Sequence, residues 1–273
     1  MIVDLHTHST VSDGTLTPPE LLHRARSNGV NCLSITDHDT VGAYQELAGV
    51  ECADLSLIPG IELSAAWASL NIHIVGLNVD LQSPVLHDAV CQQQRARLRR
   101  AQQIDLNLRK LGISGTLDGA RGIAGSDNIG RPHFAAYLVE SGAAGNTRQA
   151  FRKYLGRGKA GDVREFWPSL AVVVRWIREA AGTAVLAHPA HYQLTNTRLG
   201  RLADEFIAAG GTAIEVVSGR QAPDVTRKLA NLATEKDLLA SCGSDFHRPG
   251  QAWAELGQGC QLPAHCRAVW QGW

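Results

Sequence analysis

Short apolar runs alternate along most of the chain with segments in which apolar residues recur every three to four positions. The runs predict strands at 2–5, 31–36, 57–63, 72–78, 183–187, 213–217 and 238–242. The amphipathic segments predict helices at 18–27, 41–49, 170–181, 199–209 and 223–235. Thr17 and Glu20 have the spacing of a capping box at the start of the first helix.

This alternation of strands and helices is typical of an α/β protein with a largely parallel sheet, and about seven strands favour a barrel close to a TIM barrel. One connection differs. Between Glu62 and His73 there is no room for a crossover helix, so the third and fourth strands should form an antiparallel hairpin. With a turn near Trp67 and Ala68, the side chains of Glu62 and His73 should lie roughly opposite each other.

The middle of the chain has a helical pattern throughout. One long helix is predicted at 84–111, ended by Gly112, and shorter helices at 132–140 and 147–154. This segment carries 14 Lys and Arg against 7 Asp and Glu, whereas the whole chain is balanced at 26 and 26. We therefore expect a barrel formed by 1–83 and 169–273 and a basic helical insert, or cap domain, at 84–168.

Composition excludes several classes of protein. A chain of 273 residues with 44% hydrophobic residues can bury a full core. It has no apolar window long enough to span a membrane, and MIVDLHTHST lacks the features of a signal peptide, so we expect a cytoplasmic protein. The six cysteines form no CxxC pair and read as free thiols. The balanced charge does not favour a membrane surface or bulk nucleic-acid binding.

Histidines and carboxylates follow the predicted strands one after another. A single His-X-His or Asp-His at a strand end has a structural explanation as a polar terminus. In a barrel, however, the ends of the strands converge on one face, and bunched carboxylates there repel one another unless cations neutralise them. The set therefore predicts a metal site. Its members are His6, His8, Asp13, His38, Glu62, His73, His188, Asp245 and His247.

The motifs DLHTHS, VSDGTLTP, TDHD, GIELS, NIHIVG, AHP and GSDFH resemble, in this order, the signatures of the PHP (polymerase and histidinol phosphatase) family of metallohydrolases. This resemblance covers the chain apart from the insert. It implies a distorted (β/α)7 TIM-like barrel with a metal cluster, usually trinuclear, at the carboxyl ends of the strands.

The same resemblance implies three sets of ligands. His6, His8, Glu62 and Asp245 would hold one ion; Glu62 would bridge to a second ion held with His73 and His188; and Asp13, His38 and His247 would hold a third. It also implies that the catalytic residues are Asp13, His38, Glu62, His188 and Asp245.

The charge of such a centre favours an anionic substrate. Three divalent ions with the carboxylates of Asp13, Glu62 and Asp245 would leave a net charge of about +3. Phosphoester hydrolysis by water activated between ions is therefore favoured over amide hydrolysis. Imidazole with carboxylate suits manganese, zinc or iron, and we expect two or three ions, manganese first. Asp37 and Asp39 are expected to orient the ligands rather than bind metal.

In the insert, the run SDNIGRPHF places Arg131 and His133 where a helix begins, a suitable seat for phosphate. Asn or Asp as a cap and Pro in the first turn would also appear in a purely structural helix. Arg157 and Lys159 in GRGKAGDV are further candidates, and a solvated basic loop explains them equally well. His191 is expected to have a loop role, and Glu215 is left outside the site because no motif marks it.

Within the family, GRPHF and YLGRGK resemble the branch of nucleoside 3′,5′-bisphosphate phosphatases and related 5′-to-3′ oligoribonucleotide hydrolases. That resemblance implies cleavage of a 3′-phosphate at the metals while Arg131 and His133 hold the 5′-phosphate, and trimming of short oligonucleotides. Two alternatives stay open: a phosphatase for another small monoester such as histidinol phosphate, and a noncatalytic metal-binding module. We expect no membrane and no stable protein partner.

Overall fold

The computed structural model describes residues 1–50, 54–163 and 166–273. The chain divides into two compact units. The first unit consists of Met1–Val90 and Pro168–Trp273, and the second of Cys91–Trp167. Each unit has its own hydrophobic core.

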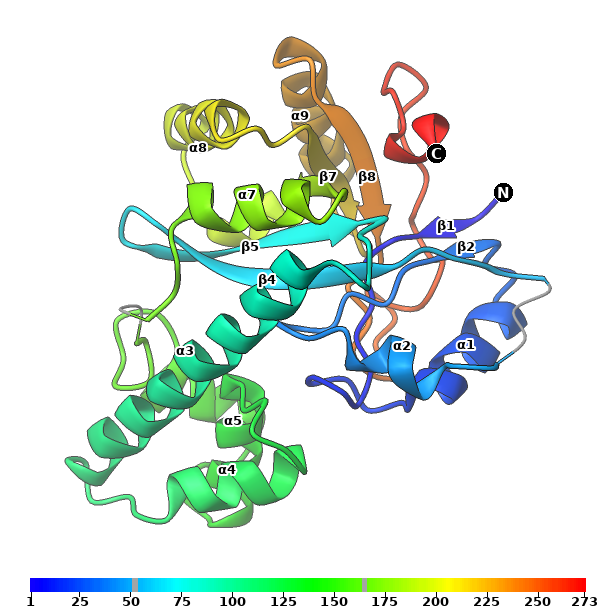
Figure 1. Cartoon of the computed structure of the whole chain (residues 1–273). Helices are drawn as coiled ribbons and strands as arrows, with labels where there is room; N and C mark the ends of the chain where they lie inside the picture. The colour runs from blue at the N-terminus through cyan, green and yellow to red at the C-terminus, as the bar shows by residue number, and fades with distance from the viewer. Residues whose placement is uncertain (51–53, 164–165) are drawn as a thin grey trace. The chain divides into compact units, whose positions relative to one another are not determined.

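The strands of the first unit form two sheets (Figure 1). The smaller sheet has the order β1 (Val3–Asp4), β2 (Cys32–Leu33) and β3 (Ser56–Leu57), and all of its strands are parallel. The larger sheet has the order β4 (Gly60–Trp67), β5 (Leu70–Leu77), β6 (Thr183–Leu186), β7 (Ala213–Ser218) and β8 (Leu239–Gly243). The predicted α/β class is therefore confirmed.

The predicted closed barrel is not found among the described residues. The predicted strand 57–63 is split at Pro59, which has no N–H to donate, into β3 and β4, and these belong to different sheets. Past β1 and β2 the two segments stay in contact: Thr36 N donates to the carbonyl of Thr7 at 2.8 Å, and Thr7 N donates to Thr36 Oγ1 at 3.2 Å. Isolated parallel bridges, Thr7 with Phe246 and His38 with Glu62, link the two sheets.

The hairpin predicted between Glu62 and His73 is present as β4 and β5, which are antiparallel. Its register pairs His73 with Ser64 and Glu62 with Val75, so Glu62 and His73 are diagonal neighbours on one face rather than opposite each other. The two-residue offset arises because the turn is at Ala68 and Ser69, with Ala68 in the left-handed region at φ 49°.

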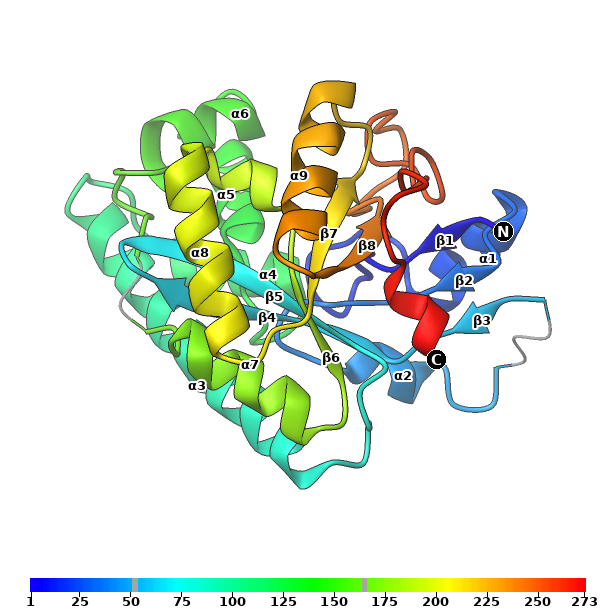
Figure 2. The same cartoon turned by 90° about the horizontal axis from the view of Figure 1, so that it is seen from above.

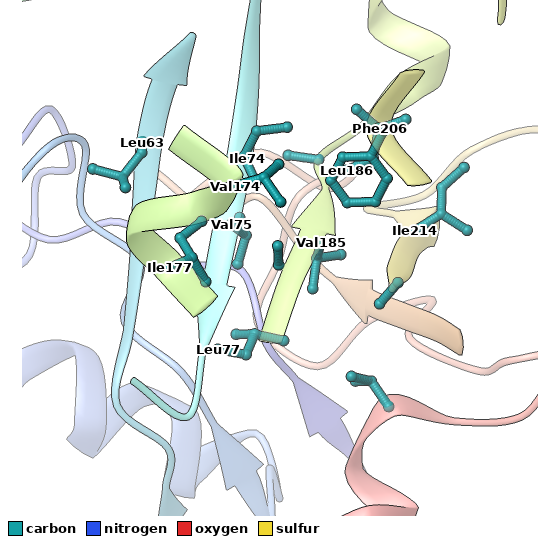
Figure 3. Packing of buried hydrophobic residues seen from close by; sticks show 14 of the residues in the cluster. Leu63, Ile74, Val75, Leu77, Val174, Ile177, Val185, Leu186, Phe206 and Ile214 are labelled. Carbon is teal, nitrogen blue, oxygen red and sulfur yellow. The ribbon is translucent and has the colours of Figure 1, made fainter. Parts of the chain in front are cut away.

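Helices pack against both sheets. α1 (Pro18–Ser27) begins with the predicted capping box, in which Thr17 N donates to Glu20 Oε2 at 2.8 Å, and α2 (Gly42–Glu46) is shorter than predicted. α7 (Leu170–Glu179) packs on β4, β5 and β6, and α9 (Pro223–Glu235) packs on β7 and β8 (Figure 2). Val174 and Ile177 of α7 lie among the apolar side chains of β5 and β6 (Figure 3). The remaining elements are α8 (Asn196–Ala208) and the 3₁₀ turns η2 (Pro189–Tyr192) and η3 (Val269–Gly272).

The second unit is helical, as predicted. α3 (Pro84–Arg109) begins in the first unit and is followed by α4 (Thr116–Ala124), α5 (Arg131–Glu140), α6 (Thr147–Ala150) and the π-helix η1 (Phe151–Leu155). α4 was not predicted, because Gly119 and Gly122 weaken its helical pattern. Gly119 is required by packing: a Cβ there would lie 1.9 Å from the ring of Tyr137. Among the described residues, no helix is both long and apolar enough to cross a bilayer.

Candidate metal centre

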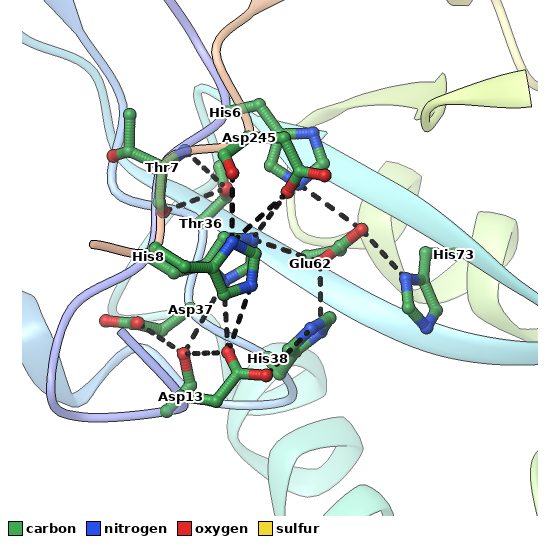
Figure 4. Close-up of polar contacts among 12 residues, drawn as sticks. His6, Thr7, His8, Asp13, Thr36, Asp37, His38, Glu62, His73 and Asp245 are labelled. Carbon is green, nitrogen blue, oxygen red and sulfur yellow. Dashed lines mark hydrogen bonds and ion pairs between the residues drawn. The ribbon is translucent and has the colours of Figure 1, made fainter. Parts of the chain in front are cut away.

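Side chains from strands of the first unit, and from the segments that follow its strands, converge in one polar cluster (Figure 4). His6 and His8 follow β1, His38 follows β2, and His188 follows β6. Asp13 lies between β1 and α1, Glu62 and His73 lie within β4 and β5, and Asp245 and His247 follow β8. All nine residues predicted as metal ligands belong to the cluster: His6, His8, Asp13, His38, Glu62, His73, His188, Asp245 and His247.

Glu62 contacts histidines through both of its carboxylate oxygens, and its side chain is fully buried. Its Oε1 lies 2.9 Å from His188 Nε2, 3.0 Å from His73 Nδ1 and 3.3 Å from His6 Nε2. Its Oε2 lies 2.9 Å from His38 Nδ1. A carboxylate with imidazoles on both oxygens has the geometry needed to bridge two ions.

Asp13 and Asp245 supply the other carboxylates. Asp13 Oδ1 lies 3.3 Å from His247 Nε2 and 3.9 Å from His8 Nδ1. Asp245 Oδ1 lies 3.5 Å from His8 Nε2 and 3.7 Å from His6 Nε2. His8 therefore lies between the two carboxylates, one facing each ring nitrogen.

The ligand atoms fall into four groups, within each of which they lie no more than 4.8 Å apart. These groups overlap the three predicted ligand sets, but His8 also joins the Asp13 set and His38 also lies beside Glu62 and His73. The four groups are His8, Asp13, His38 and His247; His6, Glu62 and His188; His6, His8 and Asp245; and His38, Glu62 and His73.

The residues present fit divalent cations. The Nε2 atoms of His6 and His8 are buried, and they have no hydrogen-bond partner among the described residues. Both nitrogens instead face carboxylate oxygens at 3.3–3.7 Å, longer than the usual hydrogen bond. Buried polar atoms aimed at one another without bonding leave a place for a cation, and imidazole with carboxylate is a donor set for zinc, manganese or iron.

The electrostatics keep the carboxylates ionised. Burial alone would raise the pKa of Glu62, but the imidazoles of His73, His38 and His6 hold that pKa well below its ordinary value. Burial alone would also raise the pKa of Asp245, but the neighbouring histidines hold that pKa well below its ordinary value. Ionised carboxylates are the form that coordinates metal.

The pKa values of the histidines differ with their surroundings. Burial, together with the charge of His247, lowers the pKa of His8 to about 3, and burial lowers the pKa of His73 to about 4. Both rings are therefore neutral and present lone pairs at physiological pH. Burial would also lower the pKa of His247, but Asp13 and Asp245 raise it to about 10, so metal binding there would displace a proton.

Asp37 and Asp39 hold the backbone around the cluster. Asp37 accepts hydrogen bonds from Ser9 N at 2.7 Å, Ser9 Oγ at 2.5 Å and Ser12 Oγ at 2.6 Å. Asp39 accepts from Ser64 N at 2.8 Å and Ser64 Oγ at 2.9 Å. These bonds fix the loop after β1 and the strand β4, from which ligands project.

Glu215 is the residue that the sequence analysis left out. It lies on β7, is 2% exposed, and its Oε1 is 3.1 Å from His6 Nδ1 while its Oε2 accepts from His188 N at 2.5 Å. The available signal was a single carboxylate within the apolar strand AIEVV. His191 was expected to have a loop role, and its ring stacks on His188 with centroids 5.0 Å apart.

Some backbone at the cluster is in the left-handed region. His188 has φ 26°, Asp39 has φ 56° and Asp245 has φ 54°. Asp39 and Asp245 lie in the usual left-handed range, whereas the φ of His188 falls outside it and is strained. Strain at a residue that supplies a ligand is typical of functional sites.

Arg131 and His133 belong to the second unit, where both lie in the first turn of α5. His133 Nδ1 accepts from Gly130 N at 2.9 Å, so its Nε2 carries the hydrogen and can donate. Arg131 donates to the carbonyl of Leu155 at 3.3 Å. The helix start therefore combines backbone N–H groups with two side-chain donors, although His133 also has the structural role of binding Gly130.

Comparisons with known proteins agree with this chemistry. The family model described as "PHP domain" matches residues 4–111. The chain is 44% identical to the 5'-3' exoribonuclease Rnm of Escherichia coli, an alignment that covers 100% of this chain and 94% of that protein. It is 42% identical to the 3',5'-nucleoside bisphosphate phosphatase of Chromobacterium violaceum, with 98% of this chain and 95% of that protein covered.

A solved structure is also similar over its whole length. It is described as an amidohydrolase from Chromobacterium violaceum with bound sulfate and no metal. The TM-score is 0.91 at 42% sequence identity, with 100% of this chain and 95% of that chain covered.

Proposed function

This chain belongs to the PHP family, and on that premise we propose that it is a metal-dependent phosphoesterase acting on nucleotides. It removes the 3′-phosphate from nucleoside 3′,5′-bisphosphates as a phosphoric monoester hydrolase, and it trims short oligonucleotides from the 5′ end. The observation that carries this proposal is the cluster around Glu62, in a chain 42% identical to a nucleoside bisphosphate phosphatase.

The fold in this proposal is a distorted (β/α)7 barrel of which the two sheets are parts. Support comes from the bridges between Thr7 and Phe246 and between His38 and Glu62, which join both sheets beside the ligands. The metal cluster then lies at the carboxyl ends of the strands, where active sites of barrel enzymes are found.

The proposed ligand sets follow the family resemblance. His6, His8, Glu62 and Asp245 hold one ion, Glu62, His73 and His188 hold a second, and Asp13, His38 and His247 hold a third. The mutual distances among Glu62, His73 and His188 support the second set, since His73 Nδ1 and His188 Nε2 are 3.3 Å apart. Manganese is the proposed metal, because imidazole and carboxylate ligands without thiolates suit it.

Bound divalent ions would supply positive charge that neutralises phosphate oxygens and favours ionisation of an attacking water. The protein's own groups prepare for this. Glu62, Asp13 and Asp245 stay ionised, and His8 and His73 stay neutral. We assign the catalytic role to Asp13, His38, Glu62, His188 and Asp245, the ligands proposed to face the reacting phosphate.

The second unit is proposed to hold the uncleaved 5′-phosphate. Arg131 offers a guanidinium that can bind phosphate through two donors, and His133 Nε2 offers a third hydrogen. The excess of Lys and Arg over Asp and Glu in the middle of the chain supports a second anion site in this cap domain. We also propose a cytoplasmic location, which is supported by cysteines that carry no disulfide among the described residues.

A phosphate-release assay with manganese tests the proposal. Adenosine 3′,5′-bisphosphate should be converted to AMP and phosphate much faster than AMP or histidinol phosphate is hydrolysed. Short oligoribonucleotides with a 5′-phosphate should be shortened from that end. If histidinol phosphate is hydrolysed and the bisphosphate is not, the enzyme is a phosphatase for another small monoester. If the metal-bound protein hydrolyses no phosphoester, a noncatalytic metal-binding module is favoured.

A further inference from the structure

We propose that Glu215 is a positioning residue of the metal centre, which fixes the ring of His6 and the backbone of His188 so that both present nitrogen to a cation. This inference rests on the proposed function only for the role that the bound metal plays in hydrolysis. The contacts themselves lie within the first unit.

The carboxylate of Glu215 divides its two oxygens between two ligands. Its Oε1 lies 3.1 Å from His6 Nδ1, and its Oε2 accepts from the backbone N–H of His188 at 2.5 Å. His6 follows β1 and His188 follows β6, so one side chain on β7 connects residues from two other strands. Such a connection fixes the relative position of the two imidazoles.

The contact with His6 determines which ring nitrogen faces the cluster. A carboxylate only accepts, so His6 Nδ1 donates to Glu215, and Nε2 is the ring nitrogen that can bind a cation. That Nε2 lies 3.3 Å from Glu62 Oε1 and 3.7 Å from Asp245 Oδ1, in the middle of the ligand set. A carboxylate behind the ring of a metal-ligating histidine fixes both its tautomer and its orientation.

The contact with His188 holds strained backbone. His188 has φ 26° and precedes the 3₁₀ turn η2. Its ring Nε2 lies 2.9 Å from Glu62 Oε1. If the carboxylate were removed, the backbone N–H of His188 would lose its acceptor, and relaxation of φ would carry the ring away from Glu62.

The strand itself is shaped to deliver this carboxylate. The pairing of β7 with β8 shifts between Glu215 and Val217, an irregularity of the β-bulge kind that re-aims side chains near active sites. The neighbours Ile214 and Val216 are fully buried. An apolar side chain would suit such surroundings better, since burying a carboxylate costs free energy unless it is bonded. The two bonds to His6 and His188 explain why a carboxylate is present.

The test compares Glu215→Gln with wild type for metal binding as well as hydrolysis. Glutamine keeps the shape of the side chain and one acceptor oxygen, but its NH₂ group must face either His6 Nδ1 or the backbone N–H of His188. Manganese affinity, measured by competition with a chromogenic chelator, should fall about 10–100-fold. Because a positioning residue acts through the ligands that it holds, saturating manganese should restore kcat, and KM for the bisphosphate should stay unchanged. Glu205→Gln is the matched control, since that carboxylate binds Trp67 and Arg201 instead of ligands.

If folded Glu215→Gln binds manganese with wild-type affinity, the inference is overturned. If, in addition, the metal-free variant melts at a lower temperature than wild type, Glu215 contributes to packing alone. If the glutamine variant fails to fold, Glu215→Asp retains an acceptor-only group too short to reach both partners and should show the same loss of affinity. If wild type binds manganese but hydrolyses no phosphoester, the proposed function fails while the affinity comparison still decides the role of Glu215.

Discussion

His38 and Glu62 meet twice, once through their side chains and once through their backbones. His38 Nδ1 lies 2.9 Å from Glu62 Oε2, and the same two residues form a parallel bridge between the two sheets. Asp39 N also donates to the carbonyl of Glu62 at 2.8 Å. The junction of the sheets is therefore also the centre of the ligand cluster, and we expect metal binding and stability of the first unit to be linked.

Removal of metal should lower the stability of the whole first unit. A ligand present at 100 times its Kd stabilises the folded state by about 2.7 kcal/mol, which corresponds to roughly 5–10 °C in Tm for a domain of this size. Dialysis against a chelator followed by calorimetry, with and without added manganese, measures this shift. Asp245→Ala is the control, because it should show little dependence on manganese; an equal shift in that variant would contradict the assignment.

His8→Ala should abolish phosphate release. His8 is fully buried and faces Asp13, Glu62 and Asp245, so its loss affects more than one ligand group. Hydrolysis should fall by more than about 100-fold, the upper range for residues that only support ligands. Elemental analysis should show less bound metal. His23→Ala, on the exposed side of α1, should keep both properties. Full activity with full metal content in His8→Ala would refute its role.

Arg131→Ala should distinguish substrates with one phosphate from substrates with two. A hydrogen bond to a charged group contributes about 1.5–3 kcal/mol, so kcat/KM for a bisphosphate should fall about 10–150-fold. Turnover of a simple aryl phosphate should change less than about twofold. Steady-state kinetics of both substrates measure the ratio. Arg109→Ala, which removes an ion pair with Asp105 in the same unit, serves as the control. Equal losses on both substrates would argue against a seat for the 5′-phosphate.

Two glycines of α4 should respond in opposite directions to alanine. Gly119→Ala places a Cβ 1.9 Å from the Tyr137 ring, and overpacking of this kind costs about 1–3 kcal/mol. Gly122 has nothing within 4 Å of an added Cβ, so Gly122→Ala should stabilise the helix by about 0.8–1 kcal/mol. Denaturant unfolding of both variants measures the difference. A loss of stability at both positions would show that the contact with Tyr137 is not what requires glycine at 119.

Elements with a strong periodic pattern could be predicted from the sequence, and elements that depend on tertiary contacts could not. The capping box at Thr17 and the β4–β5 hairpin follow from local spacing. The diagonal relation of Glu62 and His73 depends on where the turn falls, which apolar alternation alone does not set. α4 was missed because Gly119 is fixed by Tyr137, a residue of another helix.

The candidate site shows the same division. Residues that carry family motifs could be identified because each has a recognisable neighbour sequence. Glu215 has no such neighbours, and its importance depends on two contacts across 209 and 27 positions of the chain. The closed barrel was an inference from strand number, which does not show that the predicted strand 57–63 divides at Pro59 between two sheets.

The backbone at His188 has a consequence for how this chain can be improved. At φ 26° the backbone conformation costs a residue with a side chain roughly 1–3 kcal/mol more than it costs glycine. His188→Gly would release this strain, but it would also discard a nitrogen donor and the contact of 2.9 Å with Glu62 Oε1. Any stability gained by releasing strain at this position would therefore come at the expense of activity.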